Sequence, residues 1–147
     1  MNFIEKLISN FIRKYAKVMD IHLSPSLVTF YQGNRSIQAE PILCIDDKGN
    51  EATILGWSRS VKTDVNCIRI NVLDYKEFEK YPSLHQEECL AELFKIAMRE
   101  LQVETSIVRP IIRVHDASSL SKQKDMDIKT VIDNALNKCG AQKVEFV

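Results

Sequence analysis

Apolar residues recur along this chain with two different periods, and the changes between them predict the order of its helices and strands. Over residues 2–17 the apolar positions recur at the spacing of one helix face, with polar residues between them. These positions are Phe3, Ile4, Leu7, Ile8, Phe11, Ile12 and Tyr15. The pattern therefore predicts that residues 1–17 form an N-terminal amphipathic helix.

Short apolar runs that end in turn-forming residues predict a series of strands after this helix. The expected strands are Val18–Leu23, Leu27–Gln32, Ser36–Ala39, Ile42–Ile45, Thr53–Leu55 and Ile68–Leu73. The first two turns fall at residues 24–26 (Ser-Pro-Ser) and at Gly33-Asn34. Residues 46–50 are also strong turn formers, so they predict a hairpin between the fourth and fifth strands.

The second half of the chain alternates between helix and strand patterns. Ser83 and Gln86 have the spacing of a capping box, which predicts a helix start directly after Pro82. The other expected elements are an apolar helix stripe that ends at Leu101, a strand at Ile107–Val114, a helix that starts near Asp125 or Asp127 and ends before Gly140, and a strand at Lys143–Val147. This order is typical of an α/β protein.

Size and charge fit one ordinary globular domain, which we expect over residues 18–147. The chain has 147 residues, 45% of them hydrophobic and 27% charged, and its formal net charge is zero. A neutral chain has no global attraction to nucleic acid, and no apolar run is long enough to span a membrane. Cys44, Cys67, Cys89 and Cys139 form no C-x-x-C pair, which predicts buried, reduced thiols in a cytoplasmic protein.

Few residues carry chemistry that could serve catalysis. Asp20 and His22 are close in sequence, but two ligands do not make a metal site, so no metal is predicted. His115 and Asp116 precede several serines without the glycines of a nucleophile elbow, so no catalytic residue is predicted. These four residues would form the site if the chain were a small enzyme or ligand-binding domain on an unrelated α/β fold. Trp57 fits either a core position or a partner contact.

The N-terminal helix carries the strongest functional pattern. Its basic residues outweigh the single acidic residue Glu5, and they are Lys6, Arg13, Lys14 and Lys17. A basic polar face opposite an aromatic and aliphatic face suits a helix that lies in a membrane interface. A helix that packs on its own domain or on a partner subunit has the same pattern, and both interpretations stay open.

The segment from Asp20 to Thr29 reads Asp-Ile-His-Leu-Ser-Pro-Ser-Leu-Val-Thr. It is similar to the first phosphate loop of actin-like ATPases, Asp-Leu-Gly-Thr-x-x-Thr-Leu-Val-Tyr, in its Asp and its Leu-Val. His22 stands where that loop has Gly, and Leu23 where it has Thr. A side chain at position 22 blocks the close approach of backbone N–H groups to phosphate. The segment Asp20, His22, Leu23, Ser24 is therefore predicted to be a degenerate phosphate loop.

Further motifs follow in the order of one family. They are Glu40-Pro41 with the apolar run after it, Ala52 to Gly56, Arg109-Pro110 with its apolar strand, and the run from Gly140 to Val147. Together with the altered loop, they make the chain from about Val18 to Val147 resemble the N-terminal half of MreB, the bacterial actin homologue and rod shape-determining protein.

The resemblance implies a fold. In the MreB family each of two related halves is a β-β-β-α-β-α-β unit, and ATP lies between the halves. The chain is thus expected to be an α/β, actin-like ATPase first domain with a ribonuclease H-like mixed sheet, preceded by an amphipathic helix. The second nucleotide-binding half is absent, so the resemblance implies no enzyme and no cofactor.

The same resemblance implies a function. We expect a non-catalytic, MreB-like cytoskeletal or scaffolding protein of the cytoplasm that acts in cell shape or polarity. Its expected partners are a second copy of itself, in a homo-oligomer, or a full-length actin-like filament protein, and not nucleic acid. Residues 1–17 are expected to add a contact with a partner or with the inner face of the cell membrane, and Trp57 is counted with this contact surface.

Overall fold

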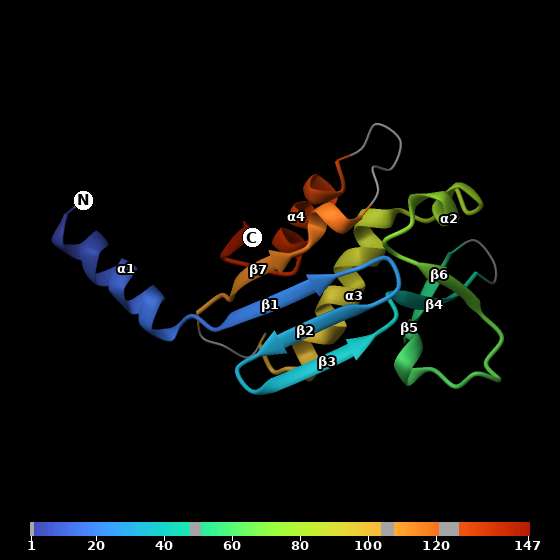
Figure 1. Cartoon of the computed structure of the whole chain (residues 1–147), viewed down its shortest axis with the longest axis horizontal. Helices are drawn as coiled ribbons and strands as arrows, with labels where there is room; N and C mark the ends of the chain where they lie inside the picture. Colours follow the sequence, from blue (N-terminus) through green and yellow to red (C-terminus); the bar gives the residue numbers. More distant parts are fainter. Residues whose placement is uncertain (1, 48–50, 104–107, 121–126) are drawn as a thin grey trace.

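The computed structural model describes residues 2–47, 51–103, 108–120 and 127–147, with the side chains of residues 12–15 left aside. The chain is a mixed α/β protein with a five-stranded mixed sheet and a three-stranded antiparallel sheet (Figure 1). Its elements are α1 (Phe3–Tyr15), β1 (Val18–Leu23), β2 (Val28–Gln32), β3 (Arg35–Ala39), β4 (Ile42–Asp46), β5 (Thr53–Trp57), β6 (Ile68–Asn71), α2 (Tyr75–Glu79), α3 (Gln86–Glu100), β7 (Ile111–His115), α4 (Ile128–Lys138) and β8 (Lys143–Phe146).

The large sheet has the strand order β3-β2-β1-β7-β8. The first three strands form an antiparallel meander through two short turns, whereas β7 and β8 run parallel to β1. The β1–β7 register runs from Val18 beside Ile111 to His22 beside His115. Because a parallel pair needs a long crossover connection, residues far apart in sequence become neighbours on this sheet.

One face of the large sheet is buried and the other is polar. In β1 the side chains of Met19, Ile21 and Leu23 lie in the core, and the alternate residues Asp20 and His22 are only half-buried. The period of two follows from the pleat of a strand. Helices α3 and α4 pack against each other and share one hydrophobic core with the buried face (Figure 1). The polar face lies on the opposite side.

The start of α3 differs from the prediction. Ser83 lies in a turn, the helix begins at Gln86, and no side chain caps its first turn. Gln86 is buried instead, and its Nε2 donates to the carbonyl oxygen of Val72 at 3.0 Å. A buried amide must satisfy its hydrogen bonds, and this tertiary contact does so for the Nε2 donor of Gln86. The apolar stripe of the helix is confirmed, from Cys89 to Leu101.

Two other helices show how side chains set the ends. Helix α2 is absent from the sequence prediction, and Asp74 starts it by accepting a hydrogen bond from the Lys76 backbone N–H at 3.0 Å. Helix α4 begins after Asp127, as predicted, and Asp127 accepts from the Lys129 N–H at 3.1 Å. Gly140 follows α4 with φ of +87°, which fits the predicted C-terminal role of a glycine.

Trp57 joins the two sheets. Its side chain is completely buried, its ring meets Phe30 of β2 edge-on at 5.7 Å between centroids, and its Nε1 donates to the carbonyl oxygen of Glu40 at 2.7 Å. Trp57 is therefore a core residue, and its assignment to the contact surface was wrong. The sequence left both interpretations open because a strand end can face either the core or solvent.

We predict that Trp57→Ala lowers the free energy of unfolding by about 3–5 kcal/mol, because a large cavity opens between the two sheets. Urea unfolding followed by far-UV circular dichroism measures the change. Leu55→Ala on the same strand is the control, since Leu55 is 42% exposed and should change stability much less. Equal losses for the two variants would contradict the packing described for Trp57.

Candidate functional site

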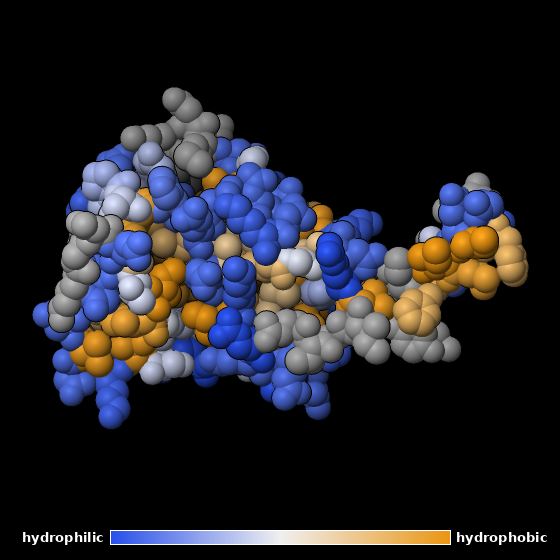
Figure 2. Space-filling view, turned by 180° about the vertical axis from the view of Figure 1, so that it is seen from behind, coloured by the Kyte–Doolittle hydropathy of each residue, from blue (hydrophilic) through white to orange (hydrophobic). Residues whose placement is uncertain are grey.

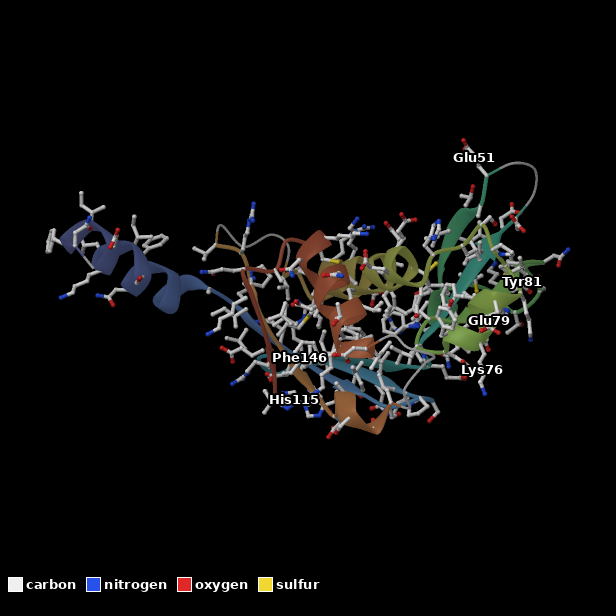
Figure 3. All side chains as sticks on the ribbon, turned by 90° about the horizontal axis from the view of Figure 1, so that it is seen from above. Glu51, Lys76, Glu79, Tyr81, His115 and Phe146 are labelled. Atoms are coloured by element: carbon white, nitrogen blue, oxygen red, sulfur yellow. The ribbon has the colours of Figure 1, made fainter. Side chains whose placement is uncertain are left out.

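The carboxyl-terminal halves of β1 and β7 bring four predicted chemical residues together on the polar face of the sheet. Asp20 lies beside Arg113, and His22 lies beside His115. Asp116 follows directly after β7. We call these five residues the polar cluster. His115 is labelled in Figure 3, on the side of the strands away from α3 and α4.

Asp20 is the centre of the cluster. Its carboxylate accepts a hydrogen bond from Arg113 Nη2 at 3.0 Å and forms an ion pair with the same guanidinium, whose Nε lies 2.9 Å from Oδ1. His115 Nε2 lies 2.7 Å from Oδ1 of the same carboxylate. Burial raises the pKa of Asp20, but the hydrogen bonds from His115 and Arg113 outweigh it, so the pKa lies below its usual value. Asp20 is therefore ionised at neutral pH.

The two imidazoles stack on each other. The rings of His22 and His115 are parallel within 2°, with centroids 4.3 Å apart, and the ring of Tyr31 meets His22 edge-on. His22 Nδ1 lies 3.6 Å from Oδ2 of Asp116. Asp116 has φ of +62°, a left-handed conformation that Asp tolerates better than most residues. The contacts therefore run from the Asp20 carboxylate to the His115 imidazole, then to the His22 imidazole, and then to the Asp116 carboxylate.

The chemistry of the cluster favours a surface network over an active site. Its residues are partly open to solvent, with side-chain exposures from 23% for Asp20 to 64% for Asp116. A cavity of about 850 Å³ lies elsewhere, near α2 and the start of α3, where Phe78 and His85 line it. Within the described ranges, no three His, Cys, Asp or Glu side chains are placed to hold a metal ion. The structure therefore brings the predicted residues together, but on an open surface.

The residues compared with a phosphate loop lie mostly inside a strand. Asp20, His22 and Leu23 belong to β1, and Leu23 is buried. The turn itself is closed by Ser24, whose hydroxyl donates to the Leu27 carbonyl oxygen and accepts from the Leu27 N–H, both at 3.0 Å. The Ser24 backbone N–H also donates to the Leu27 carbonyl oxygen at 3.0 Å. Because these groups of Ser24 and Leu27 are hydrogen-bonded to each other, they are not available to bind an anion.

Arg113 is the member of the cluster that sequence reasoning missed. The alternation in β7 places Arg113 and His115 on one face, opposite the buried Ile112 and Val114. That signal was available in the sequence. What the sequence did not show is that β7 pairs with β1 in a register that sets Arg113 beside Asp20.

Helix α1 forms the second candidate surface. The Glu5 N–H donates to Asn2 Oδ1 at 2.8 Å, and the Asn2 N–H donates to Glu5 Oε2 at 3.2 Å, which makes a reciprocal capping box. The helix extends away from the two sheets, and Figure 2 shows apolar side chains gathered along it. Their exposed fractions are Phe3 76%, Ile4 65%, Leu7 53%, Ile8 54% and Phe11 51%.

These exposures bear on the contact surface predicted for α1. Five of its seven predicted positions are exposed over more than half of the side chain. The side chains of Ile12 and Tyr15 lie outside the described residues. We call the five exposed side chains the apolar face of α1.

Comparisons with known proteins add no family. No protein-family model matches the chain, and no curated protein matches it. Within the described residues no helix has the length and apolar character needed to cross a membrane. Function must therefore be argued from the fold, the polar cluster and α1.

We predict that Asp20→Asn lowers the free energy of unfolding near neutral pH by about 1–2 kcal/mol, because the charge-assisted hydrogen bonds are weakened. The folded pKa of Asp20 lies below the unfolded value of 3.8, so its contribution is present above pH 3.8 and is lost as pH falls through the folded pKa. The variant should therefore approach the wild type in stability at low pH. Urea unfolding at pH 6 and at pH 3 measures the convergence, since the contribution of the Asp20 carboxylate declines below pH 3.8.

Asp64→Asn is the matched control, because Asp64 is exposed in a loop and its loss removes one carboxylate without breaking the cluster. A destabilisation by Asp20→Asn that persists unchanged at low pH would contradict the role given to the Asp20 carboxylate.

Proposed function

We propose that this chain is a non-catalytic, actin-like domain of the MreB type that acts by binding other macromolecules in cell shape or polarity, in the cytoplasm. The observation that carries the proposal is the apolar face of α1, which is presented to solvent. An apolar surface of this kind marks a contact site. The fold and the closed turn after β1 support the rest of the proposal.

The element order supports an actin-like first domain. After α1 the large sheet and its helices follow the order β1-β2-β3-α3-β7-α4-β8, a β-β-β-α-β-α-β unit in which β7 and β8 run parallel to β1. Strands β4, β5 and β6 with α2 are inserted between β3 and α3. The MreB-type first half has a small inserted subdomain, and this insertion is the counterpart that we assign to it.

The turn after β1 supports the absence of ATP chemistry. A phosphate loop offers free backbone N–H groups, and here the N–H groups of Ser24 and Leu27 are bonded within the turn. The imidazole of His22 stacks on His115 on the open face, at the position where the actin-like loop has Gly. The Asn71 side chain also donates to the Pro25 carbonyl oxygen at 3.0 Å, which ties the turn to β6.

The energetics of α1 favour a binding role. Full burial of one large apolar side chain is worth about 1.5–3 kcal/mol, so the five side chains of the apolar face offer several kcal/mol to a surface that covers them. A helix of 13 residues is about 20 Å long, which is too short to cross a bilayer and suits a groove or an interface. The proposed occupant is a full-length actin-like filament protein or a second copy of the chain.

A membrane surface is the second occupant that we consider for α1. Lys6 is exposed on the helix, and its sequence carries further basic residues. Basic residues beside an apolar face add attraction to anionic lipids. This role would place the protein at the inner face of the cell membrane without changing the proposed function of the domain.

A second candidate function rests on the polar cluster. The cluster gathers Asp20, His22, His115 and Asp116, as an enzyme or ligand-binding domain on an unrelated α/β fold would require. Its open position favours the binding function of α1 over this candidate, because ligand sites are mostly enclosed.

We predict that ATP does not bind this chain with micromolar affinity, because the N–H groups of Ser24 and Leu27 are bonded within the turn after β1 and are not available to phosphate. Isothermal titration calorimetry with magnesium and ATP measures the affinity. A dissociation constant in the micromolar range or below would contradict the proposal.

We also predict that Leu7→Glu weakens binding to a full-length MreB-type filament protein by at least about tenfold, because it removes apolar burial and places a charge in the contact. Co-sedimentation with filaments measures the binding, and co-sedimentation with anionic vesicles tests the membrane as occupant.

Ser9→Glu is the matched control, since it adds one negative charge on the side of the helix opposite Leu7. Equal binding by Leu7→Glu and wild type, to filaments and to vesicles, would remove α1 as the contact surface.

A further inference from the structure

Two cysteines and an arginine meet on one side of the small sheet. Cys44 of β4 lies opposite Arg69 of β6, and Arg69 Nη1 donates to Cys44 Sγ at 3.0 Å. Cys67 is two residues before Arg69, so the period of a strand places both side chains on the same side. The register therefore makes Cys67, directly before β6, the diagonal neighbour of Cys44 on this side of the sheet, and the two thiols interact electrostatically.

The two thiols differ in access to solvent. Cys44 is completely buried, whereas Cys67 is half-buried at the edge of the sheet. Burial raises the pKa of the Cys44 thiol, contact with Cys67 raises it further, and Arg69 offsets only part of this. An oxidant therefore reaches Cys67 first, and Cys44 remains beside it as a second thiol.

We propose that Cys44 and Cys67 form a reversible disulfide between β4 and β6, with hydrogen peroxide as the oxidant. In the first step the Cys67 thiolate attacks one peroxide oxygen, the O–O bond breaks, and sulfenic acid and water result after proton transfer. In the second step the Cys44 sulfur attacks the Cys67 sulfur, the S–O bond breaks and a second water leaves. The two thiols lose two electrons and two protons, and the peroxide is reduced.

Arg69 has a positioning role in the second step. Its guanidinium holds the Cys44 sulfur and stabilises negative charge as that thiol deprotonates. The Nη2 of Arg69 also donates to the Lys62 carbonyl oxygen at 3.1 Å, which fixes the guanidinium in place. The disulfide would covalently close the segment between β4 and β6 that contains the β5 hairpin.

The other two cysteines serve as internal controls. Burial is the main cause that raises the pKa of the Cys89 thiol in α3 and of the Cys139 thiol after α4, each to about 11. The Cys139 thiol donates to the Ala91 carbonyl oxygen at 3.2 Å. Their thiolates are scarce at neutral pH, so peroxide should leave them unchanged while it acts on Cys67.

Mass spectrometry of the reduced full-length chain after brief exposure to hydrogen peroxide tests this inference. We expect two thiols to become resistant to alkylation, a mass loss of two hydrogen atoms, and one peptide pair that joins Cys44 to Cys67. Dithiothreitol should restore all four thiols. Reaction confined to Cys89 or Cys139, disulfides only between two chains, or no linked Cys44–Cys67 peptide would each overturn the proposal.

Variants separate the two steps. Cys44→Ser should stop at a Cys67 sulfenic acid that dimedone traps, and Arg69→Gln should slow disulfide formation while sulfenic acid accumulates. The double variant Cys89→Ser with Cys139→Ser should form the same disulfide at the wild-type rate. Because the wild-type mapping needs no substitution, the inference remains testable even where a variant fails to fold. Disulfide formation slowed by the control variant as much as by Arg69→Gln would contradict the role of Arg69.

Discussion

The parallel pairing of β1 with β7 is the interaction on which the rest of the structure depends. Its register fixes which side chains of both strands enter the core and which stay on the open face. A shift of β7 by one residue along β1 would move Ile112 and Val114 to the open face and bury Arg113 and His115. The buried side chains and the polar cluster therefore specify the same register, one by apolar burial and the other by charge-assisted hydrogen bonds.

This arrangement divides the molecule into a packed body and an exposed helix. In the body, Trp57 links the two sheets through its contact with Phe30. In the turn after β1, Ser24 and Leu27 are hydrogen-bonded to each other. Helix α1 has its own capping box and so does not depend on the body for its start. A domain built in this way presents a helix to other surfaces, and we infer that this presentation is its function.

Local sequence patterns predicted the helices and strands better than the contacts between them. The bounds of β1 and the start of α4 follow from apolar runs and from an aspartate cap, which are local signals. The helix start predicted at Ser83 was wrong, since α3 begins at Gln86, whose side chain bonds to Val72 in a contact that only the folded chain creates. Helix α2 is too short to show an apolar stripe, so its cap Asp74 was its main signal.

The candidate sites divide in the same way. The apolar face of α1 was visible in the sequence, because the period of a single helix defines it. The residues of the polar cluster could be named individually from the sequence. Their association depends on the parallel pairing of β1 with β7, which are far apart in the chain because parallel strands need a long crossover connection. The Cys44 and Cys67 contact also needs strand pairing, since its spacing in sequence resembles no known motif.

Hydrogen–deuterium exchange across the whole chain tests the central claim most directly. The exchange is measured alone, with ATP, with a full-length MreB-type filament protein, and with anionic vesicles. Our account predicts slower exchange over α1 with filaments or vesicles, and no change with ATP at residues 20–28. Protection of residues 20–28 by ATP, with α1 unchanged by filaments and vesicles, would contradict it.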